Sequence, residues 1–265
     1  MCLRGVRLRL RVRRRGALTM APPVRGRSPI ATLQRQNRWF AAQRNRLLRR
    51  AGLRTAQTIL DIGSGPGVLL DSLSRRARGL LVGVDPDLTI LRHARSPGVA
   101  GWAESLPFRD ESVDLVLAQM VFLWMTDPGR ALCEIRGTLS RRGTLLILAE
   151  PDYGAALEYP DSGALAELAD SLRRQGADIH VARKLGGMIA EAGLVLTDCG
   201  MHAVKPIDAA RADSRWAGPD LLPGRQDREF LFVPYFWFVA RRPETLTSGP
   251  AASGTPSDRR RIPRD

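Results

Sequence analysis

Short apolar runs alternate with amphipathic stretches through the middle of the chain. Continuous apolar runs are typical of strands buried on both faces of a sheet, and the clearest occupy residues 59–62, 81–84, 114–119 and 144–149. The intervening stretches predict helices over residues 68–77, 88–94 and 128–139. Strands that alternate with helices predict an α/β fold with a parallel sheet and right-handed crossovers.

Weaker signals extend this pattern toward both ends of the chain. They predict one helix over residues 31–51, a short strand at 99–101, helices over 162–175 and 183–192, and strands at 194–197 and 235–240. Pro234 has no N–H to donate to a strand ladder, so it should lie at or before the first residue of the last strand. Residues 205–229 are rich in proline, glycine and charge, and predict an insertion or lid loop.

Length and composition suit one α/β domain with irregular ends. The chain has 265 residues, of which 44% are hydrophobic. Its three cysteines and three histidines show neither a disulfide framework nor the spacing of metal ligands, so we expect no metal. No apolar run approaches 18 residues, so we expect no membrane-spanning segment and a cytoplasmic protein.

The basic charge is concentrated at the two ends. Of the net charge of +14, residues 1–30 carry +9, all from arginine, and residues 241–265 carry +3. The remaining +2 belongs to a nearly neutral body. This distribution argues against a nucleic-acid groove in the folded domain, so nucleic acid is not the expected partner.

The N-terminal arm, residues 1–30, permits three interpretations. Its arginines suit binding to RNA or to an acidic membrane surface, and its acid-free composition suits a transit segment. The third interpretation, a start wrongly assigned upstream of Met20, is favoured because 39 arginines against two lysines are typical of GC-rich coding DNA. The tail over residues 244–265, rich in serine, threonine, proline and arginine, is expected to be disordered.

The most informative stretch is residues 59–67, where an apolar strand is followed by three glycines on alternate positions. These are Gly63, Gly65 and Gly67. Glycine lets the backbone approach a ligand closely, and the helix that begins near Val68 points its first N–H groups at that ligand. The loop therefore predicts a nucleotide-like ligand held against main chain.

The loop does not match a phosphate site. Val68 stands where the third glycine of the dinucleotide fingerprint would follow Gly63, and no lysine follows the glycines as in a phosphate-binding loop. The carboxylate of Asp61 beside the loop repels phosphate and suits a cationic ligand. S-adenosylmethionine fits, because it has an amine and a sulfonium and no phosphate.

A second buried strand ends in Asp85, 24 positions after Asp61. An acid about 20 residues beyond a glycine-rich loop lies at the end of the second strand, where it binds a ribose. A carboxylate can accept hydrogen bonds from both ribose hydroxyls. The alternative is a solvated turn residue before Pro86.

Three blocks, in this order and spacing, resemble the class I S-adenosylmethionine-dependent methyltransferases of the small-molecule type, related to the ubiquinone and menaquinone biosynthesis methyltransferases. The blocks are residues 60–67, 84–87, and 103–108 with 112–116. The resemblance implies a Rossmann-like doubly wound seven-stranded sheet, mostly parallel with an antiparallel last strand and helices on both faces. It also implies a methyltransferase domain over residues 31–243, with its first helix as a cap.

The resemblance further implies a site for S-adenosyl-L-methionine at the carboxyl ends of the strands. Its expected residues are Asp61, Gly63, Gly65, Gly67, Asp85, Pro86, Trp102, Ala103 and Gln119. Asp61 and the glycine loop would hold the methionine part, Asp85 the ribose, and the backbone of Ala103 the adenine. The family usually has an acid where this chain has Trp102, and an indole can stack on the purine but cannot accept its amino hydrogen.

The acceptor side also departs from the family pattern. Leu123 and Trp124 replace a His-His pair found in many relatives, and no N-P-P-Y motif is present. One interpretation is a small acceptor that is apolar or aromatic. The other is that these two side chains pack beneath a helix.

Methyl transfer from a sulfonium mainly requires alignment and exclusion of water, and a base helps only where the nucleophile holds a proton. Weak candidates for that base are Glu150, Asp152, Tyr153 and His180, each of which has an ordinary structural alternative. Three other functions stay open. They are an RNA methyltransferase that uses the arginine-rich arm, a nucleotide-binding oxidoreductase, which Val68 and Asp61 disfavour, and a non-catalytic binding module.

Overall fold

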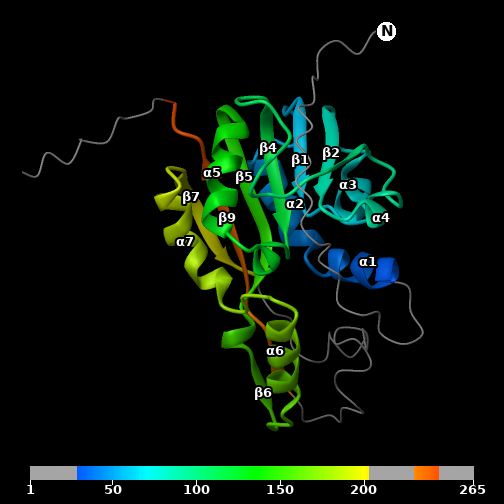
Figure 1. The fold of residues 1–265 in the computed structure, drawn as a ribbon, viewed down its shortest axis with the longest axis vertical. Helices are drawn as coiled ribbons and strands as arrows, with labels where there is room; N and C mark the ends of the chain where they lie inside the picture. Colours follow the sequence, from blue (N-terminus) through cyan, green and yellow to red (C-terminus); the bar gives the residue numbers. More distant parts are fainter. Residues whose placement is uncertain (1–28, 203–229, 245–265) are drawn as a thin grey trace, which may run out of the picture.

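A computed structural model of the protein describes residues 29–202 and 230–244, and its main feature is a seven-stranded sheet (Figure 1). The strand order is β3-β2-β1-β4-β5-β9-β7. The strands are β1 (Thr58–Ile62), β2 (Leu80–Asp85), β3 (Gly98–Ala100), β4 (Val113–Gln119), β5 (Leu139–Pro151), β7 (Val195–Met201) and β9 (Tyr235–Arg241). The first five strands in the sheet order are parallel, whereas β9 is antiparallel to both of its neighbours. The expected Rossmann-like sheet is confirmed.

Helices cover both faces of this sheet (Figure 1). The two helices that pack against one face are α2 (Ala41–Arg50) and α3 (Val68–Leu73), and those against the other are α5 (Pro128–Thr138) and α7 (Val181–Glu191). The shorter α4 (Leu88–Leu91) lies against β2 and β3, and α1 (Pro29–Trp39) contacts α3. The chain therefore forms three layers.

The central strand β4 is covered by helices on both faces, which explains why its sequence is a continuous apolar run. Leu115 and Leu117 lie in the core under α2 and α3, whereas Val116 and Ala118 lie in the core under α5 and α7. Successive side chains of a strand point to opposite faces, so a strand covered on both sides needs apolar residues at every position. All four side chains are fully buried.

The predicted strands are confirmed, with one difference at the start of β5. This strand begins at Leu139, which pairs with Val113, and then skips to Thr144, which pairs with Leu115. Arg142, in the skipped segment, has a φ of 66°. The irregular start thus has the character of a bulge, which apolar periodicity does not reveal. Pro234 lies directly before β9, as expected.

The single helix predicted over residues 31–51 is wrong. Two helices, α1 and α2, meet at Phe40, whose φ and ψ are −99° and 5°. The Phe40 ring is 7% exposed, and its centroid lies 4.6 Å from that of His202 and 4.7 Å from that of Tyr235. This tertiary contact holds the chain at the break, where local propensity alone favours a continuous helix.

A small second sheet lies beyond the carboxyl ends of the main strands (Figure 1). Its strands are β6 (Leu157–Tyr159) and β8 (Phe230–Phe232), which pair antiparallel, and α6 (Ala164–Arg174) follows β6. Three-residue strands carry almost no periodic signal, and the sequence did not predict them. The predicted lid loop over residues 205–229 lies outside the described residues, as do most of the N-terminal arm and the C-terminal tail.

Two short 3-10 turns follow the central strands β4 and β5. They are η1 (Phe122–Trp124), just after β4, and η2 (Tyr153–Ala155), just after β5. Within residues 29–202 and 230–244, no helix has the length and apolar character needed to cross a membrane.

Candidate functional site

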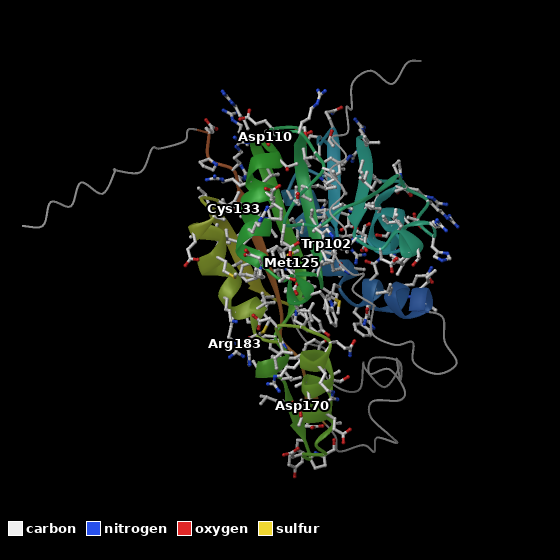
Figure 2. The ribbon with its side chains drawn as sticks, in the orientation of Figure 1. Trp102, Asp110, Met125, Cys133, Asp170 and Arg183 are labelled. Carbon is white, nitrogen blue, oxygen red and sulfur yellow. The ribbon has the colours of Figure 1, made fainter. Side chains whose placement is uncertain are left out.

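The predicted site residues gather at the carboxyl ends of β1, β2 and β4. Figure 2 shows Trp102 and Met125 toward this end of the sheet and Asp110 at the opposite end. The glycine loop is fastened to β2, because the N–H groups of Gly63 and Ser64 donate to the backbone oxygen of Val84 at 2.8 and 3.1 Å. These bonds fix the loop where the first two strands finish.

Each glycine of the loop has a positive φ, but only one of them faces open space. A Cβ on Gly63 would stand 2.3 Å from Cγ2 of Val121, and one on Gly67 would stand 2.8 Å from the Cβ of Ala94. A Cβ on Gly65 would meet nothing within 4 Å. The outer two glycines are therefore required by packing, whereas Gly65 presents bare backbone to space that a ligand can occupy.

Asp85 lies beside this open position. Its two carboxylate oxygens accept from the N–H groups of Gly65 and Asp87, each at 2.9 Å. Burial raises the pKa of Asp85, and the same two hydrogen bonds oppose that rise. Each oxygen still has a lone pair free. The acid predicted to bind a ribose is therefore half-buried, held in place, and able to accept further donors.

Asp61 is more deeply placed, with 2% of its surface exposed. Within the described part of the chain its carboxylate receives no hydrogen bond. Burial, and then the nearby charge of Asp85, raise the pKa of Asp61 well above its usual range, while Arg44 opposes the rise. Ionising a buried acid without a hydrogen-bond donor is costly, which is the physical cause of the raised pKa, and such perturbed acids concentrate at functional sites.

The segment after β3 borders the same region. The N–H of Gly101 donates to the backbone oxygen of Asp85 at 3.1 Å, and Trp102 forms an isolated bridge with Ser105. Trp102 is half-buried and does not belong to either large core cluster of the described residues. The next residue, Ala103, is buried.

The neighbouring acid, Glu104, does not replace the acid that the family usually has before the alanine. Its carboxylate accepts from the N–H groups of Thr126 and Asp127 at 3.1 and 3.3 Å. Its backbone oxygen accepts from Nε of Arg130 at 2.8 Å. Glu104 therefore joins the segment after β3 to the segment after η1.

The end of β4 carries an unpaired acceptor and a strained residue. Oε1 of Gln119 is buried without a hydrogen-bond partner in the described structure. The next residue, Met120, has a φ of 55°, and its N–H donates to the backbone oxygen of Ala149 at 2.9 Å. Unpaired buried acceptors and left-handed non-glycine residues are uncommon and concentrate at ligand sites. Both observations support a ligand at this strand end.

Glu150, predicted as a weak candidate base, is fully buried behind the site. Its oxygens accept from the N–H groups of Val121 and Leu123 at 3.1 and 2.8 Å, which anchors η1. Burial raises the pKa of Glu150 to about 7, and these hydrogen bonds oppose the rise. The arrangement favours a structural role, because both oxygens already hold backbone donors.

Two further candidates, Tyr153 and His180, have different surroundings. Tyr153 belongs to a small cluster with Tyr235, and burial raises the pKa of its hydroxyl. His180 packs over Gly154, with its Nδ1 3.9 Å from Oδ1 of Asp152. Asp152 already forms a two-point ion pair with Arg183 at 2.6 and 2.7 Å. Asp152 thus joins η2 to α7, whereas Tyr153 faces the aromatic cluster.

Sequence reasoning missed this aromatic cluster and the arginine beside it. Its aromatic members are Phe40, Tyr235, Tyr153 and Trp39, which pack with aliphatic side chains and Met120. Arg44 is 4% exposed although it carries a charge. One signal existed, because Phe40, Arg44 and Leu47 share the helical spacing of one face, and an arginine on an apolar face is unusual.

No group of three or more histidine, cysteine, aspartate or glutamate side chains suited to a metal ion occurs within the described ranges.

Comparison with known proteins identifies the central part of the chain. A protein-family model described as "Methyltransferase domain" matches residues 60–147. An uncharacterized 37.1 kDa protein in a transposon of Streptomyces fradiae is 28% identical over 214 residues, covering 74% of this chain and 59% of that protein. A malonyl-[acyl-carrier protein] O-methyltransferase of Coxiella burnetii is 35% identical over 89 residues, covering 33% of this chain and 32% of that protein.

Solved structures support the same fold. The phosphoethanolamine N-methyltransferase 2 of Haemonchus contortus, solved in complex with S-adenosyl-L-methionine, superimposes with a TM-score of 0.58 at 16% identity, covering 82% of this chain and 57% of that one. At this identity the likeness concerns the fold. The chain spans about a third to three-fifths of the length of these relatives.

Proposed function

Because this chain belongs, through residues 60–147, to the class I S-adenosylmethionine-dependent methyltransferases, we propose that it transfers a methyl group from S-adenosyl-L-methionine to a small acceptor. The observation that carries the proposal is the pair of acids around Gly65. Asp85 is fixed beside open backbone, and Asp61 is a buried carboxylate that no donor satisfies. One acid suits a diol and the other suits a cation.

The residues present fit S-adenosylmethionine. Asp61 and the backbone of the glycine loop would hold its methionine end, Asp85 its ribose, and the edge formed by Trp102 and Ala103 its adenine. Oε1 of Gln119, buried without a partner in the described structure, offers a further acceptor at the end of β4. When bound, the sulfonium supplies an already activated methyl group.

The side chains of this protein would then orient the acceptor and keep water away. Val121, directly before η1, lies against Gly63 of the glycine loop, and Trp124 is partly exposed on that turn. The aromatic cluster around Phe40 and Tyr235 lies at the ends of β4, β5 and β9. The partly exposed indole of Trp124 supports an acceptor that is itself apolar or aromatic.

Calorimetry of the full chain with three ligands tests the function. We expect S-adenosylmethionine and S-adenosylhomocysteine to bind with micromolar Kd values, and NAD not to bind. NAD carries a pyrophosphate, and Val68 stands where the dinucleotide fingerprint would have its third glycine. Binding of NAD in preference to the two sulfur nucleosides would contradict the proposal and favour the oxidoreductase alternative.

Replacing Trp124 by alanine tests the apolar acceptor site. With an acceptor chosen from a panel of phenols, aromatic acids and alkyl acids, we expect kcat/KM to fall about 5- to 30-fold, because part of an apolar wall is lost. Binding of S-adenosylhomocysteine should not change, and Trp124→Phe should retain most of the activity. Unchanged methyl transfer by Trp124→Ala, measured with labelled cofactor, would show that this indole only packs against the core.

A further inference from the structure

The nearly neutral charge of the body of the protein conceals an uneven distribution. Residues 31–60 hold seven arginines and neither a lysine nor an acid, so they contribute +7 to the +2 of the body, and residues 61–240 carry −5. The first acid of the chain is Asp61, which is buried. Positive charge is therefore concentrated in the segment that forms most of α1, the whole of α2 and the turn that leads into β1.

Helix α2 carries three of these arginines on its outer surface. Its buried side consists of Leu47, Leu48 and Arg44. The exposed arginines of the helix lie three and four positions apart, and they are Arg46, Arg49 and Arg50. Side chains at this spacing are neighbours on a helix, so like charges are brought together at a small cost in stability.

The turn after α3, residues 74–79, adds arginines to the same surface. It lies against the turn after α2, residues 51–57, because the N–H of Leu80 donates to the backbone oxygen of Gln57 at 2.8 Å. Nη1 of Arg76 donates to Oδ1 of Asn45, which joins this turn to α2 itself. The exposed arginines of the two turns are Arg54, Arg75 and Arg78. We call the six exposed arginines of α2 and these turns the basic face.

Acids do little to balance the basic face within the described ranges. One ion pair is present, between Nη2 of Arg50 and Oδ2 of Asp198 at 2.7 Å. The other five arginines form neither an ion pair nor a side-chain hydrogen bond with a described residue. Asp71, the one acid among residues 62–84, is partly buried on α3.

The cations of α6 and α7 have a different environment. Each has an acid within 2.6 to 2.8 Å in the pairs Arg173–Asp170, Arg183–Asp152 and Lys184–Asp178. Charge on that side of the molecule is balanced locally, whereas charge on the basic face is not. A surface of one sign attracts partners of the opposite sign, and binding such a partner removes the repulsion among its own charges.

The chemistry of the basic face favours an anionic lipid surface. A guanidinium can bind phosphate through two parallel hydrogen bonds, and clusters of about four to eight basic residues on a helix are typical of binding to anionic lipids. No aromatic residue occurs in α2 or in the two turns, so the basic face has no platform on which nucleic-acid bases could stack. Leu80, 43% exposed at the end of the second turn, offers an apolar contact instead.

We propose that the basic face docks the protein on an anionic lipid membrane by binding the phosphate groups of the lipids. None of its arginines belongs to the site proposed for the cofactor, so the inference stands independently of the proposed function. Docking would also bring the protein to the phase in which an apolar acceptor dissolves.

Co-sedimentation of the full chain with lipid vesicles tests the proposal. The vesicles consist of phosphatidylcholine alone or with about 30% phosphatidylglycerol, at low and at high salt. We expect the triple variant Arg49→Gln, Arg54→Gln and Arg75→Gln to bind the anionic vesicles about 100-fold more weakly at low salt, since each arginine near such a surface contributes about fivefold. The difference should shrink at high salt, because salt screens exposed charges.

A matched control removes the same charge from exposed positions outside the basic face. This second triple variant carries Arg141→Gln, Arg173→Gln and Arg174→Gln. It should weaken binding to the anionic vesicles less than about threefold, because these arginines do not face the lipid. The comparison separates a defined docking surface from the general attraction of a chain with arginine-rich ends. Thermal unfolding should be similar in both variants, since all six replaced side chains are exposed.

Four results would overturn the proposal. They are equal losses in the two triple variants, unchanged binding by the first variant, equal binding of the natural protein to neutral and anionic vesicles, and binding that does not weaken with salt. Tighter binding to RNA than to anionic vesicles, lost in the first variant, would assign the basic face to nucleic acid and also overturn it. A failure to bind S-adenosylhomocysteine would contradict only the proposed function.

Discussion

Replacing Asp85 by alanine is expected to weaken S-adenosylhomocysteine binding by about 1.5–3 kcal/mol, roughly 10- to 150-fold, because both ribose hydroxyls lose a charged acceptor. The structure adds a second reason, since the carboxylate also holds the N–H groups of Gly65 and Asp87. The loop would then lose its fixed shape as well as its ligand contact. Isothermal calorimetry at constant ionic strength measures the loss.

Two matched variants separate these contributions. Asp85→Asn keeps one acceptor oxygen and should lose less than the alanine variant. Asp87 lies two positions further, where it caps α4 through the N–H of Thr89 at 2.8 Å, so Asp87→Ala should change ligand affinity less than threefold. A loss of less than about threefold for Asp85→Ala would contradict the ribose role.

The second large effect concerns stability and Glu150. Burial raises its folded-state pKa to about 7 from a usual 4.5, so the folded protein binds more protons than the unfolded chain between these values. This contribution to stability is present below about pH 4.5 and is lost as pH rises through about 7. We expect the unfolding free energy to fall by about 3 kcal/mol over that window from this group alone.

Glu150→Gln isolates the contribution, since all other titrating groups are common to both proteins. In urea unfolding at pH 5, 6.5 and 8, the variant should gain stability relative to the natural protein as pH rises. Its amide oxygen can still accept from Val121 or Leu123, which keeps η1 partly anchored. A constant difference between the two proteins at the three pH values would show that Glu150 is ionised throughout.

The parts of the site that depend on backbone geometry could be predicted from local sequence. Glycine is required at Gly63 and Gly67, where a Cβ would clash with Val121 or Ala94, and Asp85 ends a strand with a clear apolar run. Such features involve few residues at short range, so motif spacing was enough to predict them. The sheet followed for the same reason, because continuous apolar runs identify central strands.

The parts that failed or were missed depend on contacts between distant segments. Phe40 breaks the predicted N-terminal helix because its ring packs against Tyr235 and His202, which lie more than 160 positions away. Arg44 is buried where it donates to Asn37 of α1, a contact that no local pattern indicates. Glu150 lies near the end of β5 as expected. Its side chain anchors η1 by accepting from the N–H of Leu123, and the sequence alone does not reveal this contact.

The place of β9 between β5 and β7 has a consequence for biosynthesis. This strand holds residues 235–241, so a nascent chain that has left the ribosome only as far as β7 has two unpaired strand edges and no means to join them. The final strand must enter a gap whose sides were translated long before, and pairings of such long sequence separation form slowly. Chaperones that shield exposed edges should therefore engage this protein late in translation, and premature stop codons before residue 235 should yield aggregates instead of a smaller folded domain.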